Sequence, residues 1–151
     1  MDNLLNDEYF MRIALTEAEK ALDKGEIPIG CVIVSNELLI AKAHNLTETL
    51  RDATAHAEMQ AFTSASEYLG AKYLKDCTLY VTLEPCIMCM GASCWTQIER
   101  IVYGATDKKH TLPVEKMLFL HPKTTITGGV LEKECAKILT TFFQQKRKER
   151  N

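Results

Sequence analysis

Two short segments of the sequence carry side chains that can bind a metal ion and move protons. The first opens at Thr54 and contains His56 and Glu58; the second contains Cys86 and Cys89. On the first turn of a helix, two cysteines three residues apart lie on the same face, so both sulfurs can hold one ion. His56 and Glu58 are two residues apart, and they face one pocket only if their helix begins close to Thr54.

The number of ligands distinguishes a catalytic zinc site from a structural one. A closed structural site uses four nitrogen or sulfur ligands, whereas these segments offer one histidine and two cysteines and leave a position for water. Zinc lowers the pKa of a bound water towards about 7, and Glu58 is then placed to carry protons. Two alternatives stay open: a structural site completed by His44, Cys94 or Glu84, and a redox-active pair of cysteines.

Helices and strands alternate along the chain, and their pattern predicts what positions these segments. Apolar residues at helical spacing predict helices, two of which end at Gly25 and Gly70, and short apolar runs predict strands. Pro85 fits the first position of the third helix. This alternation indicates an α/β sheet with helices on both faces. We expect helices at 9–22, 54–69, 85–97 and 131–148, and strands at 29–34, 38–43, 77–83, 101–104 and 124–127.

Length and composition predict one globular domain spanning residues 1–151. The chain has 151 residues, 46% of them hydrophobic and 25% charged; typical domains have roughly 100–200 residues. No apolar run approaches the roughly 20 residues that a membrane helix needs, and the acidic N-terminus lacks the pattern of a secretory signal. We therefore expect a cytoplasmic protein with no membrane partner, in which the six cysteines are not a disulfide framework.

The charge of the chain is small but unevenly placed. A formal net charge of −2 gives no overall field that would indicate a nucleic-acid partner. Residues 146–150, however, carry four cations and one anion. A basic helix end can contact phosphate, and it can equally be a solvated terminus whose cations suit the helix dipole. Both interpretations stay open at this point.

The combination of His-x-Glu with Pro-Cys-x-x-Cys, in this order, is more specific than either half, and it is the signature of the zinc-dependent nucleobase deaminases. On this motif the chain resembles the cytidine deaminase-like superfamily. Within it, the chain is most similar to the bacterial tRNA-specific adenosine deaminases. The resemblance runs almost end to end. The matching segments are Glu26–Gly30, His44–Asn45, Thr54–Glu58, Leu79–Cys86, Met88–Ala92, Tyr103–Ala105, Asp107 and the Phe142–Phe143 tail.

The resemblance implies a zinc-dependent hydrolytic deaminase. In such an enzyme His56, Cys86 and Cys89 would bind Zn²⁺, and Glu58 would protonate the ring nitrogen N1 and later the departing amine. Attack of the activated water on C6 of adenine releases ammonia and leaves inosine. The implied substrate is the wobble adenosine of a tRNA anticodon loop, which must be flipped into the site; unpaired nucleotides cost least to unstack.

The resemblance also implies two substrate-binding residues. Asn45 matches the family asparagine that hydrogen-bonds the target base, and the backbone N–H of Ala57 would contact the same ring. A buried amide suits this role because it offers both a donor and an acceptor. From the residues alone, Asn45 is explained equally well as a loop residue bonded to its own backbone.

The expected architecture follows from the same resemblance. It is the three-layer α/β/α cytidine deaminase-like fold with a central five-stranded mixed sheet. Members of the superfamily usually form homodimers in which the partner subunit helps to shape the site and bind RNA, so we expect a homodimer here.

The sequence departs from the tRNA branch in two places. Residues 108–114 replace the loop that usually follows the position of Asp107, and Ala53 stands where the branch commonly has proline. The replaced loop lies near the expected RNA-facing rim, and Trp95 also fits an enzyme acting on free bases. A deaminase of free guanine, cytosine or a nucleoside is therefore the alternative. A non-enzymatic, zinc-stabilised RNA-binding module is a third hypothesis, and it predicts a fourth protein ligand.

Overall fold

The elements of the computed structural model follow the predicted order, with one addition. The structure describes residues 4–109 and 115–151. The 3₁₀ helix η1 is the element that the sequence pattern does not predict. The elements are α1 (Asp7–Asp23), β1 (Gly30–Ser35), β2 (Leu38–His44), α2 (Ala57–Leu69), β3 (Cys77–Leu83), α3 (Ile87–Thr96), β4 (Arg100–Ala105), η1 (Lys116–Phe119), β5 (Thr125–Thr127) and α4 (Glu132–Arg150).

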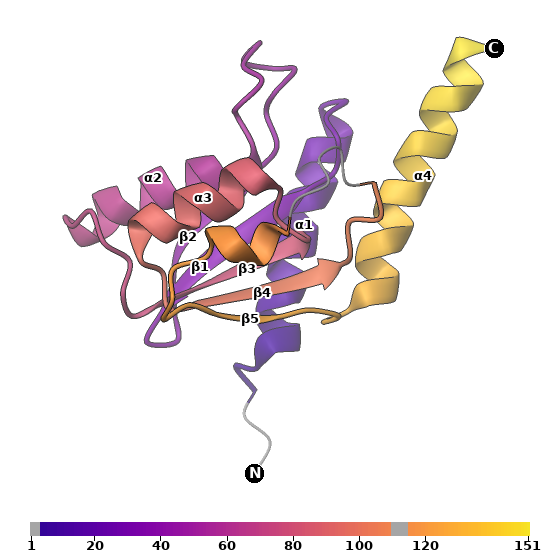
Figure 1. Ribbon diagram of the computed structural model, residues 1–151. Coiled ribbons are helices and arrows are strands. Elements are labelled where there is room, and N and C mark those ends of the chain that lie inside the picture. Colours follow the sequence, from indigo (N-terminus) through magenta and orange to yellow (C-terminus); the bar gives the residue numbers. More distant parts are fainter. Residues whose placement is uncertain (1–3, 110–114) are drawn as a thin grey trace.

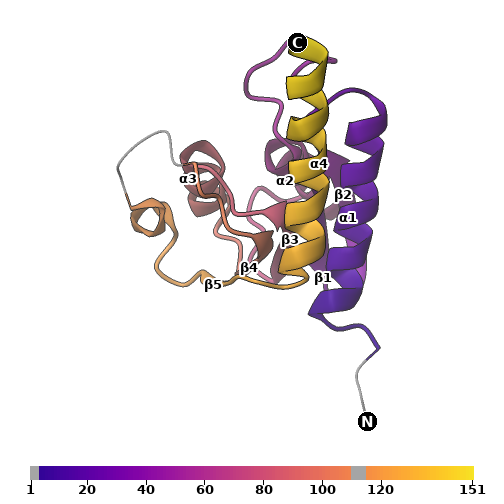
Figure 2. The same ribbon diagram turned by 90° about the vertical axis from the view of Figure 1, so that its right-hand side faces the viewer.

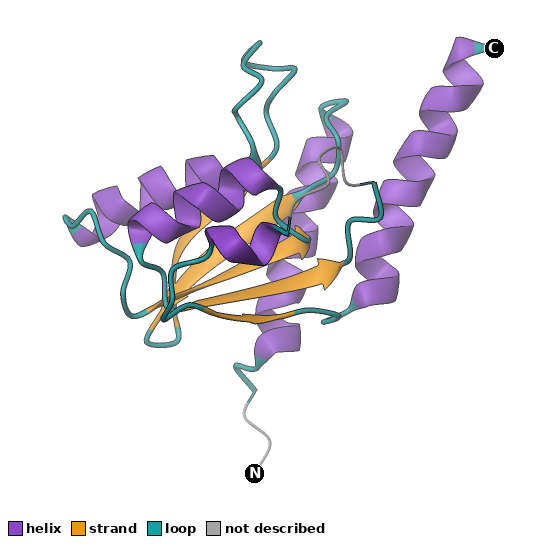
Figure 3. Cartoon of the chain, viewed as in Figure 1, coloured by secondary structure: helices purple, strands orange, loops and turns teal. Residues whose placement is uncertain are grey.

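The five strands form one mixed sheet in the order β2-β1-β3-β4-β5. Strand β1 runs antiparallel to β2 and β3, whereas β4 runs parallel to β3 and β5. Figure 3 shows this sheet surrounded by helices. The turn between β1 and β2 uses Asn36 and Glu37, both with positive φ (50° and 64°), which matches the twist of a two-residue hairpin. The expected α/β fold with a five-stranded mixed sheet is confirmed.

Helices cover both faces of the sheet and give the molecule three layers, with α1 and α4 on one side and α2 and α3 on the other (Figures 1 and 2). Because side chains of a strand alternate between faces, β1 contributes to both cores. Cys31 and Ile33 pack in the cluster that includes Ala61 of α2, whereas Val32 packs in the cluster that includes Met11 of α1. No helix in the described part of the chain is long and apolar enough to cross a membrane.

Helix α1 lies unusually close to the start of β1, and a glycine makes this approach possible. A Cβ atom on Gly30 would lie 2.2 Å from the carbonyl oxygen of Ala14 and 2.3 Å from the backbone nitrogen of Ala18. The Gly30 N–H donates to the hydroxyl of Thr82 on β3, at 3.2 Å. The segment that enters β1 is therefore fixed between α1 and the centre of the sheet, and the carbonyls of Ile27 and Ile29 accept hydrogen bonds from Asn45.

Candidate active site

Helix α2 begins at Ala57, three residues later than the sequence pattern predicts. The carboxylate of Asp52 accepts hydrogen bonds from the backbone N–H and the hydroxyl of Thr54, at 2.9 and 2.8 Å, and this local turn keeps Thr54 out of the helix. His56 occupies the N-cap position with extended backbone angles and makes no capping bond through its side chain. Its imidazole therefore extends beyond the end of α2.

Helix α3 likewise begins later than expected, at Ile87. The prediction that Pro85 is its first residue is wrong, because the chain is still bonded to the sheet at this point: the N–H of Glu84 donates to the carbonyl of Ala105, at 2.8 Å. Cys86 is the N-cap residue, again without a side-chain capping bond. Cys89 follows in the first turn of α3, so both sulfurs lie at its N-terminal end as the spacing predicts.

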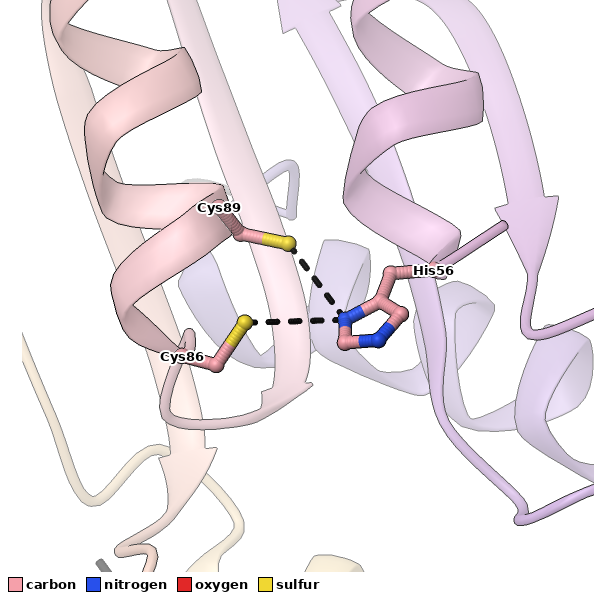
Figure 4. Close-up of side chains that lie close together, drawn as sticks. All are labelled: His56, Cys86 and Cys89. Atoms are coloured by element: carbon pink, nitrogen blue, oxygen red, sulfur yellow. Dashed lines mark hydrogen bonds between the residues drawn. The ribbon is translucent and has the colours of Figure 1, made fainter. Parts of the chain in front are cut away.

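The two helix ends bring the three predicted ligands together (Figure 4). Nδ1 of His56 lies 3.6 Å from the sulfur of Cys86 and 3.6 Å from that of Cys89. Zinc bound tetrahedrally at about 2.1 Å from nitrogen and about 2.3 Å from sulfur places these atoms about 3.6 Å apart. The donor set therefore fits Zn²⁺ in type and in spacing. Among the described residues, these three form the one group of three or more side chains that could hold a metal ion.

The cysteines differ in protonation because each responds to its neighbours. The sulfur of Cys86 accepts hydrogen bonds from the Cys89 thiol and from the His56 imidazole, and these lower the pKa of Cys86 to about 4. The same bond to Cys86, with burial, raises the pKa of Cys89. The separate hydrogen bond between His56 and Cys86 raises the pKa of His56. Cys86 is thus a thiolate at neutral pH, in the form that binds metal, and the N-terminal end of α3 favours that charge.

Glu58 lies in the first turn of α2, and its carboxyl group is buried. It is the second residue of α2 and is 3% exposed. Burial raises the pKa of Glu58, and the negative charge of Cys86 acts in the same direction. A carboxyl group with a raised pKa beside a metal centre can both accept and release a proton near neutral pH.

Asn45 is buried, and its neighbour Leu46 donates to the carbonyl of Ala55 in the segment before α2, but the Asn45 side chain bonds to nearby backbone. Its amide nitrogen donates to the carbonyl of Ile27 and its amide oxygen accepts from the N–H of Thr47, both at 3.4 Å. These contacts correspond to the loop-residue interpretation, and base binding stays a prediction. Ala57 is 1% exposed and is the first residue of α2, so its N–H has no acceptor within the helix.

The structure does not support a fourth protein ligand among the described residues. The imidazole of His44 lies 3.6 Å from a carboxylate oxygen of Glu17 and 3.0 Å from the ammonium of Lys24. Glu84 accepts a hydrogen bond from the N–H of Asp107. Neither these two residues nor Cys94 belongs to the metal-binding group. The site therefore has the three-ligand composition of a catalytic zinc centre.

Glu26 is a positioning residue that sequence reasoning quoted in a motif but gave no role. It is fully buried, and its carboxylate accepts from the N–H of Glu48 at 3.0 Å and from the N–H and hydroxyl of Thr49, each at 2.6 Å. Burial opposes its ionisation, but the hydrogen bonds from Thr49 and Glu48 outweigh it and lower the pKa. The carboxylate thereby fixes the loop that begins at Asn45. The available signal was an acidic residue directly before Ile27-Pro28, within a segment that matches the family.

A groove of about 720 Å³ lies beside this loop. Two of its lining residues belong to the site's surroundings, since Ile27 accepts from Asn45 and Glu48 donates to Glu26. The C-terminal half of α4 forms the other side and contributes three cations and two aromatic rings, and Lys109 adds a fourth cation from the segment after β4. The lining residues are Gly25, Ile27, Glu48, Lys109, Phe142, Phe143, Lys146, Arg147 and Arg150.

Comparison with protein families identifies the chain. Residues 5–105, which hold all three candidate ligands, match the family model of the cytidine and deoxycytidylate deaminase zinc-binding region. The chain belongs to this family. As a member of the cytidine and deoxycytidylate deaminases, it is a zinc-dependent hydrolytic deaminase, and the group of His56, Cys86 and Cys89 is the part of the described chain suited to the metal.

Relatives within the deaminase family cover nearly the whole chain. The tRNA-specific adenosine deaminase of Aquifex aeolicus is 44% identical over 147 residues, covering 95% of this chain and 97% of the relative. That of Bacillus subtilis is 43% identical over 152 residues, with 97% and 94% covered. The resemblance seen in the sequence is confirmed.

Solved structures of deaminases agree with this fold. One, from a study of A-to-I editing by tRNA:A34 deaminases at the wobble position, superposes with a TM-score of 0.79 at 40% identity and covers 87% of this chain and 99% of that one. Guanine deaminase from Nitrosomonas europaea gives a TM-score of 0.83 at 25% identity, with 93% and 86% covered. The overall backbone alone does not separate the two substrate classes, whereas sequence identity favours the tRNA branch.

Proposed function

We propose that this protein deaminates the wobble adenosine of a tRNA anticodon loop to inosine. The observation that carries the proposal is the meeting of one imidazole, two thiols and a buried carboxyl group at two helix ends. It occurs in a chain that is 44% identical to a tRNA-specific adenosine deaminase along 95% of its length. We assign the activity to one deaminase domain spanning residues 1–151 and, because the substrate is tRNA, to the cytoplasm.

In the proposed mechanism His56, Cys86 and Cys89 hold Zn²⁺. Zinc bound there would supply an activated water as nucleophile towards C6 of the base. Glu58 would take one proton from that water and deliver it to N1. It would then move the remaining hydroxyl proton from the oxygen added at C6 to the amine, and the C6–N bond would break to release ammonia. The raised pKa of Glu58 suits it to both transfers.

The target base would be held by backbone and amide groups at the same helix end. The N–H of Ala57, free of a helical acceptor, would donate to the ring. Asn45 would exchange its two bonds of 3.4 Å for contacts with the base edge. Bonds of this length are weak, so the exchange costs little.

The basic groove supports a polynucleotide substrate. Lys109 lies over the ring of Phe143 at 5.5 Å and Lys146 over that of Phe142 at 5.6 Å. Surfaces that bind single-stranded nucleic acid commonly combine cations with aromatic rings, because the rings stack on bases while the cations contact phosphates. Of the two interpretations of the basic tail, this arrangement favours contact with phosphate. The replaced loop, residues 108–114, lies outside the described residues from position 110 onward.

We also propose that the enzyme is a homodimer formed through an apolar patch on α3 and η1. The patch consists of Trp95, 84% exposed, and Met117, Leu118 and Phe119 of η1, which packs against α3. Several large apolar side chains exposed on two elements in contact are typical of a protein interface. A monomer in sedimentation velocity at micromolar concentration would contradict this assembly.

The decisive experiment is a turnover assay on RNA and on free bases in parallel. Zinc-loaded protein is incubated with a seven-nucleotide anticodon loop on a stem carrying adenosine at the wobble position, and inosine is quantified after nuclease digestion. We expect inosine at the wobble position alone. A matched stem-loop with adenosine moved to a neighbouring loop position serves as the substrate control, and Glu58→Ala serves as the enzyme control.

The controls separate the candidate functions. Glu58→Ala should keep its zinc and its fold but lose turnover by about 10²–10⁴-fold, because it removes the proton carrier and no ligand. Ammonia released from free guanine, cytosine or nucleosides, with no inosine in the stem-loop, would replace the proposal by the free-base alternative. Absence of turnover on every substrate by zinc-loaded protein would favour the non-enzymatic module.

A further inference from the structure

A buried lysine lies between two carboxylates at the edge of the sheet where the second metal-binding segment begins. Lys116, the first residue of η1, is 9% exposed. Its ammonium nitrogen lies 3.5 Å from Oε2 of Glu84 and 3.7 Å from Oδ2 of Asp107, and it has no hydrogen-bond partner within the described parts of the chain. Burying an ammonium group destabilises the folded state unless opposite charges lie nearby. The two carboxylates therefore explain why Lys116 can be buried here.

Each carboxylate divides its two oxygens between the lysine and the backbone. Oε1 of Glu84 accepts the N–H of Asp107, at 3.0 Å, while its other oxygen faces Lys116. Oδ1 of Asp107 accepts the N–H of Lys109, also at 3.0 Å, while its other oxygen faces Lys116. The lysine thus holds the two groups that fix the backbone of residues 105–109, which we call the rim segment.

The rim segment connects the metal centre to the basic groove. At one end, Glu84 lies two residues before Cys86 and is bonded through its N–H to the carbonyl of Ala105. At the other end, Lys109 lines the groove and lies over the ring of Phe143 on α4. The position of Lys109 relative to the metal ligands therefore depends on the backbone that Glu84 and Asp107 hold.

We propose that Lys116 is a positioning residue for RNA: by compensating Glu84 and Asp107 it fixes the rim segment and so sets where the groove begins relative to the metal centre. This inference rests on the proposed function. Without the ammonium, the two carboxylates face each other uncompensated and repel, and Asp107 turns towards solvent. The rim segment must then be ordered by the RNA itself, at a cost in affinity.

The test compares Lys116→Met with Lys123→Met, which removes the same charge from an exposed position on the same stretch of chain. Binding of the wobble-adenosine stem-loop is measured in the Glu58→Ala background, where no turnover interferes, and kcat and KM are measured in the active background. Hydrogen exchange of the Asp107 and Lys109 amides reports the rim segment directly, with no RNA present.

For Lys116→Met we expect faster exchange of both amides, a Kd for the stem-loop raised by about tenfold, and kcat at saturating RNA within about twofold of wild type. Lys116→Arg should restore most of the affinity. Lys123→Met should change Kd by less than about twofold. Combining Asp107→Asn with Lys116→Met should give less than the sum of the single effects, because both act through one cluster.

Several results would overturn the inference. Unchanged exchange and unchanged Kd in a folded, zinc-loaded Lys116→Met protein would do so, as would an equal loss of affinity in Lys123→Met. Should Lys116→Met fail to fold, Lys116→Gln, which keeps a donor but removes the charge, is judged by the same measurements. Wild-type protein that leaves the stem-loop unconverted overturns the proposed function, and with it the role in RNA binding. Normal conversion with an inert Lys116 overturns the role of the lysine alone.

Discussion

His56 and Cys86 each occupy the N-cap position of a helix, where a side chain ordinarily bonds to a free backbone N–H, and neither makes such a bond. Their polar atoms point towards each other instead. An N-cap residue has extended backbone angles, so its side chain can reach past the helix end. Each helix start therefore lacks a local capping bond and instead offers its side chain to the group suited to a metal.

At this scale, replacing one thiol tests the metal site. Cys86→Ala should lose zinc and lower the thermal midpoint by several degrees, because metal binding and folding are coupled. Zinc content is measured by atomic absorption and stability by calorimetry. Cys94→Ala is the matched control, since this cysteine lies on the same helix but outside the metal-binding group, and it should keep its zinc. Equal zinc content in both variants would contradict the assignment.

The chemistry of the side chains made the candidate ligands and the candidate proton carrier predictable, but not the residues that position neighbouring segments. Imidazole, thiolate and carboxylate side chains at deaminase spacing identify His56, Cys86, Cys89 and Glu58 as candidates. The structure brings the ligand atoms of the first three within 4.8 Å of one another, where they could hold one ion. Lys116 could not be found this way. Its role depends on η1 folding back against the sheet edge, and no local pattern records that contact.

At the scale of elements, α1 is attached to the sheet by a polar cluster far from the metal. Asp7, the first residue of α1, accepts two hydrogen bonds from the guanidinium of Arg100, at 2.8 and 2.7 Å, and one from the hydroxyl of Tyr80, at 2.9 Å. A bidentate pair of this kind fixes both position and orientation. The hydrogen bonds from Arg100 lower the pKa of Asp7.

This pair predicts how stability depends on pH. Because the folded-state pKa of Asp7 lies below its ordinary value of 3.8, its contribution is complete above that value and is lost as the pH falls through the folded-state pKa. Asp7→Asn should lower the free energy of unfolding by about 1–2 kcal/mol at pH 7, and by progressively less below pH of about 4.

Urea unfolding of wild-type and variant proteins between neutral and acidic pH measures this difference. The control is Asp23→Asn at the opposite end of α1, where removal of an acid from a helix C-terminus should leave stability unchanged or slightly raised. A destabilisation by Asp7→Asn that is the same at every pH would contradict the ionic interpretation.

Element types and order were predictable, whereas element starts were not. The apolar run 77–83 predicts β3 to the residue, because a central strand is apolar on both faces. The starts of α2 and α3 depend on contacts outside each helix: a turn formed by Asp52 in one case, and pairing with β4 in the other. Helix periodicity contains no information about either contact.

At the scale of the whole molecule, the small net charge conceals a strongly basic groove on α4. Arg147 lines this groove and its neighbour Lys148 does not. If the groove follows the RNA backbone, Arg147→Gln should weaken binding of the stem-loop and reduce the slope of log affinity against log salt by about 0.7–1.

Lys148→Gln is the matched control for this prediction, because it removes an equal charge at the adjacent position. It should leave the salt slope nearly unchanged. Affinity is measured by fluorescence anisotropy over a range of potassium chloride concentrations. Identical slopes for the two variants would show that α4 attracts RNA only through its overall charge.

Helices α2 and α3 both begin directly after candidate metal ligands. The supply of zinc should therefore affect how long the protein survives in the cell. Each helix starts at an N-cap residue whose side chain makes no capping bond and belongs to the group suited to the metal, so a bound ion would tie the two helix starts together. Cells starved of zinc would hold a chain with two loosened helix ends, which proteases degrade more readily. When zinc is scarce, the amount of enzyme would then fall, because zinc-free protein is degraded and does not accumulate.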